Sequence, residues 1–199
     1  MKIAVRFGCM LISFWLTSCT FLQPAALAPQ NKSLGWSTRE QTLSQIKTWN
    51  LKGLIAIRTD KGADSASLNW QQHNQHYMLS LFGPLGTNAY KLSGFPGKVT
   101  LINPKGQTFS ADSPEQLLAQ QTGWRLPLSN LNYWIRGLPA PGAATKQLDQ
   151  YNHIIQMHQG SWEIRYLRYT SVGNHDLPNK IFINSPQLSV KIIISEWQI

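Results

Sequence analysis

Cys19 is the residue whose surroundings point most directly to a chemical reaction. Lys2 and Arg6 precede an apolar run that ends in Leu16-Thr17-Ser18-Cys19. A branched apolar residue and two small residues before a cysteine form a lipobox, at which a signal peptide is cleaved after the cysteine thiol has been acylated. The run is too short for a membrane-spanning helix, which needs about 20 apolar residues. We therefore expect residues 1–18 to be a lipoprotein signal peptide and Cys19 to carry the lipid.

Processing at Cys19 has consequences for cysteine use and for charge. Cys9 lies in the removed segment and the sulfur of Cys19 is acylated, so we expect no disulfide and a fold held by its core alone. The remaining 181 residues suffice for one such core. Without Lys2 and Arg6 the chain has 16 basic and 9 acidic residues, a net charge of +7. In an exported protein this surplus favours anionic lipid headgroups or acidic proteins over nucleic acid.

The sequence contains no motif typical of catalysis. We find no nucleophile elbow, helical H-E-x-x-H, glycine-rich phosphate loop or closely paired carboxylates. His73 and His76 lie near a hairpin, but no cysteine or carboxylate nearby completes a metal site. We interpret them as solvated, and His153 and His158, which bracket a strand, in the same way. We expect no catalytic residue, no metal and no cofactor.

Four arginines stand among apolar neighbours. They are Arg58, Arg136, Arg165 and Arg168. The simplest interpretation is a solvated strand face, or side chains whose apolar stems lie on the protein while their charges reach water. Some of them could instead line a rim that meets a partner.

The turn Gly83-Pro84-Leu85-Gly86 separates two apolar strands and carries a leucine at its tip. Turn tips normally carry polar residues, so this leucine needs an explanation. Either the tip folds back onto the core, or Leu85 protrudes toward an apolar partner such as a membrane.

Aromatic residues are numerous, with eight tryptophans, six tyrosines and seven phenylalanines. Most should form ordinary core. Aromatic and aliphatic walls also suit acyl chains, which need dispersion contacts and no specific hydrogen bonds. The candidates for lining an apolar cavity are Trp70, Leu79, Leu81, Trp134 and Trp162.

The elements that must position these residues begin after a linker. Residues 19–35 contain two prolines and no periodicity, which predicts a flexible tether with a reach of roughly 20 to 24 Å. Ser37-Thr38-Arg39-Glu40 predicts a capping box and a first helix, with Leu43, Ile46 and Trp49 on one stripe.

Beyond Leu51 the hydrophobic period changes to two, which predicts successive strands with short links. We expect further strands at 76–82, 87–94, 98–103, 151–158, 162–170, 180–184 and 188–197. Ser113-Pro114-Glu115 should cap a second helix, and residues 127–137 a third.

Links this short allow only antiparallel pairing. The sequence therefore predicts one mainly β domain over 36–199, with helices on one side of a long antiparallel sheet. Such a sheet curls and leaves a concave apolar side that suits an apolar ligand.

Several segments together resemble the LolB family of outer-membrane lipoprotein receptors. The resemblance covers nearly the whole mature chain and rests on the order and spacing of five segments after the lipobox. These are Trp49 to Thr59 (WNLKGLIAIRT), Trp70 to Gln72, Gly83 to Gly86, Gly123 to Pro127 (GWRLP) and Tyr133 to Pro141 (YWIRGLPAP).

The resemblance implies an incomplete antiparallel β-barrel similar to the periplasmic carrier LolA, with an apolar cavity closed on one side by helices. A receptor of this family accepts acylated lipoproteins from LolA and releases them into the outer membrane without covalent chemistry. It also implies that Leu85 matches the tip of a loop that contacts membrane phospholipids. Thr20 is not the aspartate that retains lipoproteins in the inner membrane of enterobacteria. We therefore expect a monomer anchored by lipid in the outer membrane and facing the periplasm.

Two other functions are compatible with a lipidated β-rich domain. One is a lipoprotein that binds a different apolar molecule, which needs a cavity but no membrane-seeking tip. The other is a structural envelope lipoprotein, which needs a filled core and no cavity.

Overall fold

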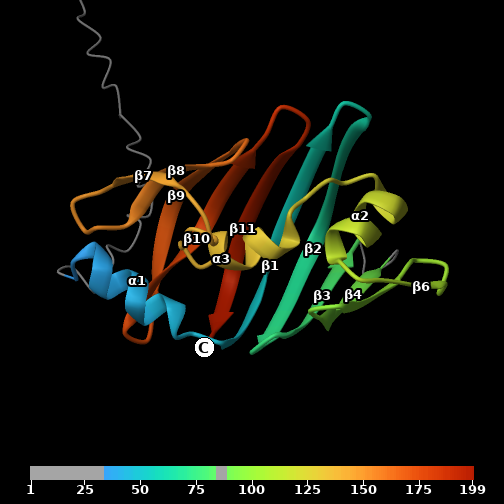
Figure 1. Ribbon diagram of the computed structural model, residues 1–199, viewed down its shortest axis with the longest axis horizontal. Helices are drawn as coiled ribbons and strands as arrows, with labels where there is room; N and C mark the ends of the chain where they lie inside the picture. The colour runs from blue at the N-terminus through green and yellow to red at the C-terminus, as the bar shows by residue number, and fades with distance from the viewer. Residues whose placement is uncertain (1–33, 84–88) are drawn as a thin grey trace, which may run out of the picture.

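The computed structural model describes residues 34–83 and 89–199, which form one curved sheet and three helices (Figure 1). In chain order the elements are α1 (Trp36–Ser44), β1 (Thr48–Thr59), β2 (Gly62–His73), β3 (His76–Phe82), β4 (Tyr90–Phe95), β5 (Lys98–Ile102), β6 (Thr108–Ala111), α2 (Pro114–Thr122), α3 (Leu128–Trp134), β7 (Thr145–Leu148), β8 (Ile154–Gln159), β9 (Trp162–Val172), β10 (His175–Asn184) and β11 (Ser189–Gln198).

The sheet has the strand order β6-β5-β4-β3-β2-β1-β11-β10-β9-β8-β7, and neighbouring strands are antiparallel. The strands β1 and β11 pair at its centre, whereas β6 and β7 are its edges and do not pair with each other in the described part of the chain. The barrel is therefore incomplete, which confirms the predicted fold class.

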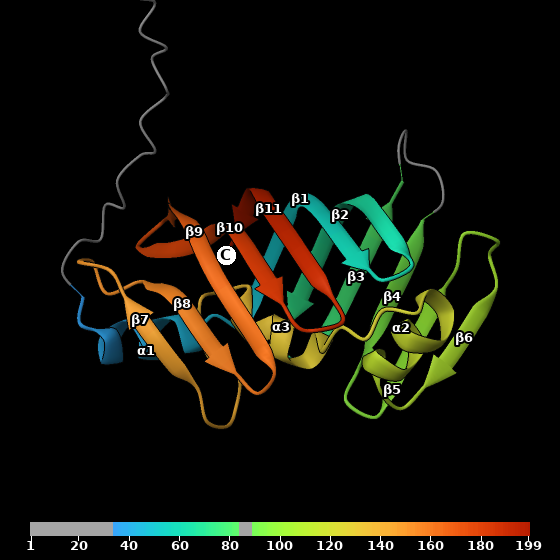
Figure 2. The same cartoon turned by 90° about the horizontal axis from the view of Figure 1, so that it is seen from above.

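This strand order explains where α2 and α3 lie. The chain leaves the sheet at the edge strand β6 and re-enters it at the opposite edge strand β7, so the segment between them must cross the sheet. Figure 2 shows all three helices on the same side of the curved sheet, with α3 near its middle. The crossing segment thus covers the concave face.

Buried and exposed residues alternate along the strands, and the buried ones form the core. In β1 the residues Trp49, Leu51, Ile55 and Ile57 are buried, and the residues between them are exposed or half-buried. Inward residues of β3, β5, β10 and β11 follow the same period and pack against α2 and α3. The buried face of the sheet and the apolar sides of these helices form one continuous core.

Gly53 marks the one register shift in the β1–β11 pairing, between Lys52 and Gly53. A Cβ atom at this position would lie 2.1 Å from the backbone oxygen of Ile193. Only glycine therefore allows β11 to approach β1 this closely.

The second helix forms as the sequence predicts. The Ser113 side chain accepts a hydrogen bond from the Gln116 amide at 3.3 Å, Pro114 occupies the first turn, and Gly123 ends the helix in the left-handed region at φ 77°. These are standard start and stop signals of a helix.

The predicted start of the first helix is wrong. Helix α1 begins at Trp36 after Gly35, and no side chain caps it. Trp49 belongs to β1, because its indole is buried against the sheet residues Trp70 and Trp197 rather than on a helical stripe. The short strands β6 and β7 were not predicted either, because four residues are too few to show a period.

Candidate functional site

Two open pockets lie at opposite ends of the concave side, with α3 between them. The first pocket has a volume of about 1140 Å³ and is lined by the α1–β1 link, the β2–β3 hairpin, the β4–β5 turn and the α3 segment. The second has about 1350 Å³ and is lined by the β1–β2 and β10–β11 turns together with the end of α2. Pockets of roughly 300 to 1,000 Å³ already hold drug-sized ligands, so both have room for part of a lipid.

The deep part of the first pocket is aromatic. The ring centroids of Trp49 and Trp70 are 5.2 Å apart, and those of Trp49 and Trp197 are 5.5 Å apart. The Trp70 indole donates to Oε1 of Gln72 at 3.3 Å, and Gln72 in turn donates to the Asn74 carbonyl at 2.8 Å. Hydrogen bonds within the β2–β3 hairpin therefore fix the orientation of this tryptophan.

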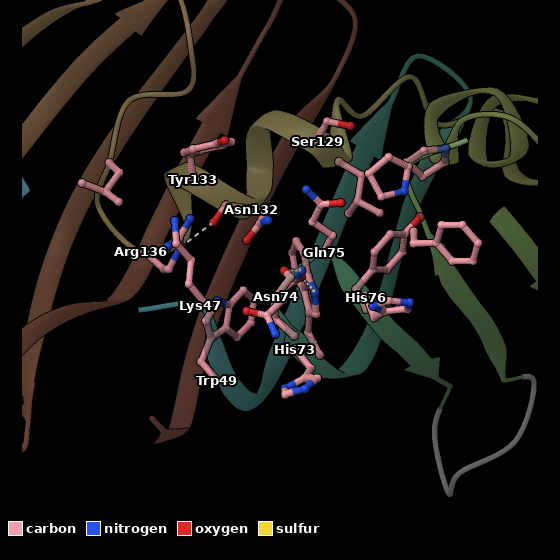
Figure 3. Close-up of a pocket in the computed structure, with 18 of the residues that line it drawn as sticks. Lys47, Trp49, His73, Asn74, Gln75, His76, Ser129, Asn132, Tyr133 and Arg136 are labelled. Atoms are coloured by element: carbon pink, nitrogen blue, oxygen red, sulfur yellow. Dashed lines mark hydrogen bonds between the residues drawn. The ribbon is translucent and has the colours of Figure 1, made fainter. Parts of the chain in front are cut away.

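The mouth of the first pocket is polar. Figure 3 shows Ser129 and Asn132 on the α3 side and Lys47, Asn74 and Gln75 on the opposite side. Glu40, Asp112 and Glu115 add acidic groups to the lining. An aromatic interior under a polar mouth suits a ligand with an apolar tail and a polar head.

Arg136 anchors the end of α3 to the α1–β1 link. Its guanidinium donates to the carbonyls of Asn132 at 3.0 Å, Ile46 at 2.9 Å and Leu43 at 3.4 Å. Burial lowers the pKa of Arg136, opposed by the nearby Tyr133. The interpretation of this arginine as solvated is wrong, because it satisfies the carbonyls left open after α1.

Arg58, Arg165 and Arg168 are exposed on their strands, in agreement with their interpretation as solvated. The guanidinium carbon of Arg165 also lies 5.8 Å from the centre of the Phe182 ring.

The centre of the concave side is filled. Trp134 is completely buried and donates to Oε1 of Gln159 at 2.8 Å. Gln159 also bonds to both the amide and the carbonyl of Ala140, and the Tyr166 hydroxyl donates to the Trp134 carbonyl at 2.9 Å. The C-terminal end of α3 is thus held by satisfied polar contacts.

The second pocket has a mixed charged lining. It includes the basic residues Arg58, Lys61 and Arg125 and the acidic residues Asp60 and Asp64, with Trp124 and Trp162 beside them. The ring centroid of Trp162 lies 5.8 Å from that of Trp134, so this aromatic wall continues into the core.

The residues predicted to line a cavity are divided between these places. Trp70 lines the first pocket and Trp162 the second, whereas Leu79, Leu81 and Trp134 are buried in the core between them and line neither pocket. Whether acyl chains touch these five stays a prediction.

Two other predicted features lie at the limits of the structure. Gly83 is half-buried just after β3. Pro84, Leu85 and Gly86, like Cys19, are outside the described residues.

The interpretation of His153 as solvated is wrong. Its ring is 1% exposed, with Nδ1 3.0 Å from Oδ2 of Asp149 and Nε2 3.1 Å from Oδ2 of Asp176. The ring stacks on Tyr169 at 4.4 Å, and Arg39 lies 3.6 Å from the same Asp176 oxygen. Asp176 is distant from His153 in the sequence, and Asp149 lies across a turn from it. No local pattern therefore indicated this cluster. His73, His76 and His158 are exposed, as expected.

Sequence reasoning also missed three residues of the first pocket, Trp49, Tyr77 and Asn132. Asn132 offered a signal, since it is a polar residue amid the apolar positions of α3. Among residues 34–83 and 89–199, no group of histidines, cysteines and carboxylates could hold a metal, and no helix is long and apolar enough to cross a membrane.

The antiparallel sheet is curled but open, helices lie across its concave side, and amphipathic pockets lie on either side of α3. This arrangement defines a class of proteins that bind apolar groups. Comparison with known proteins gives the family. The family model described as Outer membrane lipoprotein LolB matches residues 47–197.

Relatives in two bacteria agree with this match. The outer-membrane lipoprotein LolB of Coxiella burnetii strain RSA 493 is 40% identical over 98% of this chain and 92% of its own length. That of Nitrosococcus oceani is 38% identical over 89% and 88%. A LolA superfamily protein from Nitrosomonas europaea has the same fold, with a TM-score of 0.54 at 9% identity over 84% of this chain and 94% of its own.

The chain belongs to the LolB family of outer-membrane lipoproteins. This family receives lipoproteins from LolA and inserts them into the outer membrane, so it serves transport and is not a family of enzymes. Its members are anchored by lipid in the outer membrane and face the periplasm. Of the functions considered from the sequence, these findings support the transfer receptor.

Proposed function

We propose that the acyl chains of a lipoprotein bind on the concave side of the sheet and enter it through the first pocket. The observation that carries this proposal is the arrangement of that pocket, in which Trp49 and Trp70 lie deep and polar side chains surround the mouth. Acyl chains gain about 0.8 kcal/mol per buried CH₂, so they favour the aromatic depth. The polar lipoprotein body stays outside, at the mouth.

Chains longer than the pocket must extend along the sheet beneath α3. That helix is tied at its C-terminal end by Arg136 and Trp134, whereas near its start the described contacts include one bond from the Ser129 amide to Glu115 at 2.8 Å. We therefore expect α3 to shift more at its start than at its tied C-terminal end when chains enter.

The remaining features of the receptor follow from the lipobox and the turn after β3. Residues 1–18 are the signal peptide, lipidated Cys19 anchors the chain, residues 19–35 form the tether, and 36–199 form one domain. The chain acts as a monomer. The turn Gly83-Pro84-Leu85-Gly86 contacts outer-membrane phospholipids during delivery.

Transfer can be tested directly. LolA loaded with a photoreactive lipoprotein, whose probe lies in an acyl chain, is mixed with the full chain, and cargo transfer and crosslinked positions are measured. We expect crosslinks to Trp49, Trp70 and residues of α3. Transfer with crosslinks only around the second pocket would place chain entry at the other end of the molecule.

The assignment of Cys19 has its own measurement. Mass spectrometry of the mature protein should find the N-terminus at Cys19 with the acyl groups attached. A variant that combines Cys19→Ala with a signal peptide cleaved without lipidation should be soluble. It should still accept cargo, because the pocket belongs to the folded domain. Loss of acceptance in that variant would contradict this separation of anchor and site.

A further inference from the structure

Among the described residues that line the first pocket, three have a buried polar side-chain atom with no hydrogen-bond partner. These atoms are Nε1 of Trp49, the hydroxyl of Tyr77 and Oδ1 of Asn132. They come from β1, β3 and α3, respectively, and all three residues line the first pocket. Buried polar atoms are nearly always paired in folded proteins, and an unpaired one needs an explanation.

Poor packing does not explain the two aromatic donors, because comparable indole and hydroxyl groups elsewhere in the described residues are paired; a second asparagine oxygen, Oδ1 of Asn179, is unpaired outside this pocket. The indoles of Trp70, Trp134 and Trp197 all donate, the last to the Pro178 carbonyl at 2.9 Å. The hydroxyls of Tyr166 and Tyr169 also donate to backbone carbonyls. Unpaired aromatic donors among the described residues thus occur at the first pocket and not at these other sites.

The chemistry of the three atoms specifies a ligand. An indole N–H can only donate. Burial, aided by the negative charge of Glu115, raises the pKa of Tyr77, so its hydroxyl stays protonated at neutral pH and can donate as well. The Asn132 oxygen can only accept. The set therefore fits a group with carbonyl oxygens and an amide N–H.

The linkage region of an acylated lipoprotein has this composition. Two ester carbonyls join the acyl chains to glycerol, and an amide joins the third chain to the cysteine nitrogen. Trp49 and Tyr77 lie on the sheet side of the pocket and Asn132 on the α3 side (Figure 3 shows Trp49 and Asn132), so a linkage held between helix and sheet has donors on one side and an acceptor on the other.

We infer that the first pocket recognises the ester and amide linkages of the lipid as well as its acyl chains, with Trp49 and Tyr77 donating to ester carbonyls and Asn132 accepting from the amide. This inference rests on the proposed function, since it requires the lipid to enter there. It adds a specificity that hydrophobic burial cannot supply, because chains on ether or ester linkages are equally apolar.

The test compares two probes on the full chain with Cys19→Ala, which has no lipid of its own to compete. One probe is a fluorescent N-acyl-S-diacylglyceryl-cysteine peptide, and the other is its dialkyl ether analogue. We expect the ester probe to bind about tenfold more tightly. Tyr77→Phe should remove most of this preference by weakening the ester probe alone, and Trp49→Phe should also reduce it. Asn132→Leu should weaken both probes equally, since both keep the amide.

Tyr166→Phe is the matched control. It removes a paired hydroxyl, so it should lower thermal stability and leave the ester preference unchanged. Tyr77→Phe removes an unpaired one and should not lower the stability of the empty protein. Equal binding of the two probes by the unmodified pocket, or a stability loss in Tyr77→Phe like that in Tyr166→Phe, would overturn the inference while leaving chain binding intact. Failure of both probes to bind would overturn the proposed pocket itself.

Discussion

Asp176 is an acidic residue buried in the core among polar partners. It is completely buried, within 3.1 Å of His153 and 3.6 Å of Arg39, and it accepts from the Ser171 hydroxyl at 2.8 Å. Asp176→Asn keeps the shape but removes the charge opposite a buried arginine. Removing one partner of a buried ion pair typically costs about 3 kcal/mol. Urea denaturation should show this loss, and Glu196→Gln, at the exposed pair with Lys52, should leave the midpoint unchanged.

A substitution at Leu85 should distinguish delivery of cargo into a membrane from receipt of cargo from LolA. Because we expect Leu85 to lie at the tip of a protruding turn, Leu85→Glu should change stability little, within about 0.5 kcal/mol. It forfeits roughly 1.5 to 3 kcal/mol of apolar burial in a bilayer and brings a carboxylate to an anionic surface. Transfer from LolA should persist while incorporation into liposomes falls. If receipt falls as far as delivery, Leu85 is a core or cavity residue.

At the scale of elements, the close approach of β11 to Gly53 of β1, beside the bulge at Ser195 of β11, determines how the middle of the sheet packs. Gly53→Ala would place a methyl group 2.1 Å from the Ile193 oxygen, so β1 and β11 must separate. We expect a loss of about 2 to 3 kcal/mol in the free energy of unfolding. Gly35→Ala is the control, because the added methyl meets open space there. Equal thermal midpoints for the two variants would show that the strands can adjust.

The folding stability contributed by the turn before β8 should depend on pH, because Asp149 titrates there. Partial burial would raise the pKa of Asp149, but hydrogen bonds from the amides of His153 and Tyr151 and from the His153 ring outweigh it and hold the pKa below its ordinary value. The resulting stabilisation is present above the unfolded pKa of about 3.9 and is lost as pH falls through the lower folded value.

Asp149→Ala lacks these bonds at any pH. The difference in stability between the original chain and this variant should therefore be full near neutral pH and shrink below about pH 4. A difference that stays constant down to about pH 2 would contradict the assignment.

At the scale of the whole molecule, positive charge is concentrated on the sheet face away from the helices. Basic side chains on this face include seven on β1, β4, β9, β10 and β11, and the acids Glu163 and Glu196 are each within 4.0 Å of a basic partner. The seven are Lys52, Arg58, Lys91, Arg165, Arg168, Lys180 and Lys191. Much of the surplus positive charge inferred from the sequence therefore lies on one face of the molecule.

This face should speed association with anionic surfaces. Surface charges are screened beyond about 8 Å at physiological ionic strength, so the on-rate to anionic vesicles or to loaded LolA should fall as salt rises. Stopped-flow measurements of the chain and a Lys180→Gln/Lys191→Gln variant would check this. The variant should show a smaller salt dependence, and a salt-independent rate in the original chain would exclude steering.

The sequence was informative about the sheet and less so about the site. Alternation placed β3 at its observed bounds, and Ser113 with Pro114 located α2, because these signals are local. The partners of His153 and Arg136 depend on strands and links far apart in the chain, and no local pattern encodes them. The same holds for Trp49, Tyr77 and Asn132, which meet only because α3 crosses the sheet.

The pairing of β1 with β11 also bears on how the chain folds. Asn50 pairs with Gln198, and Leu51 with Trp197, so the central contact of the sheet joins residues nearly 150 positions apart. Contacts so distant in sequence make folding slow, because a long loop must close before they form. A chain emerging from synthesis thus lacks β11 until almost all of it has been made and stays without its central pairing. We expect this delay to help the chain stay unfolded during its export toward the outer membrane.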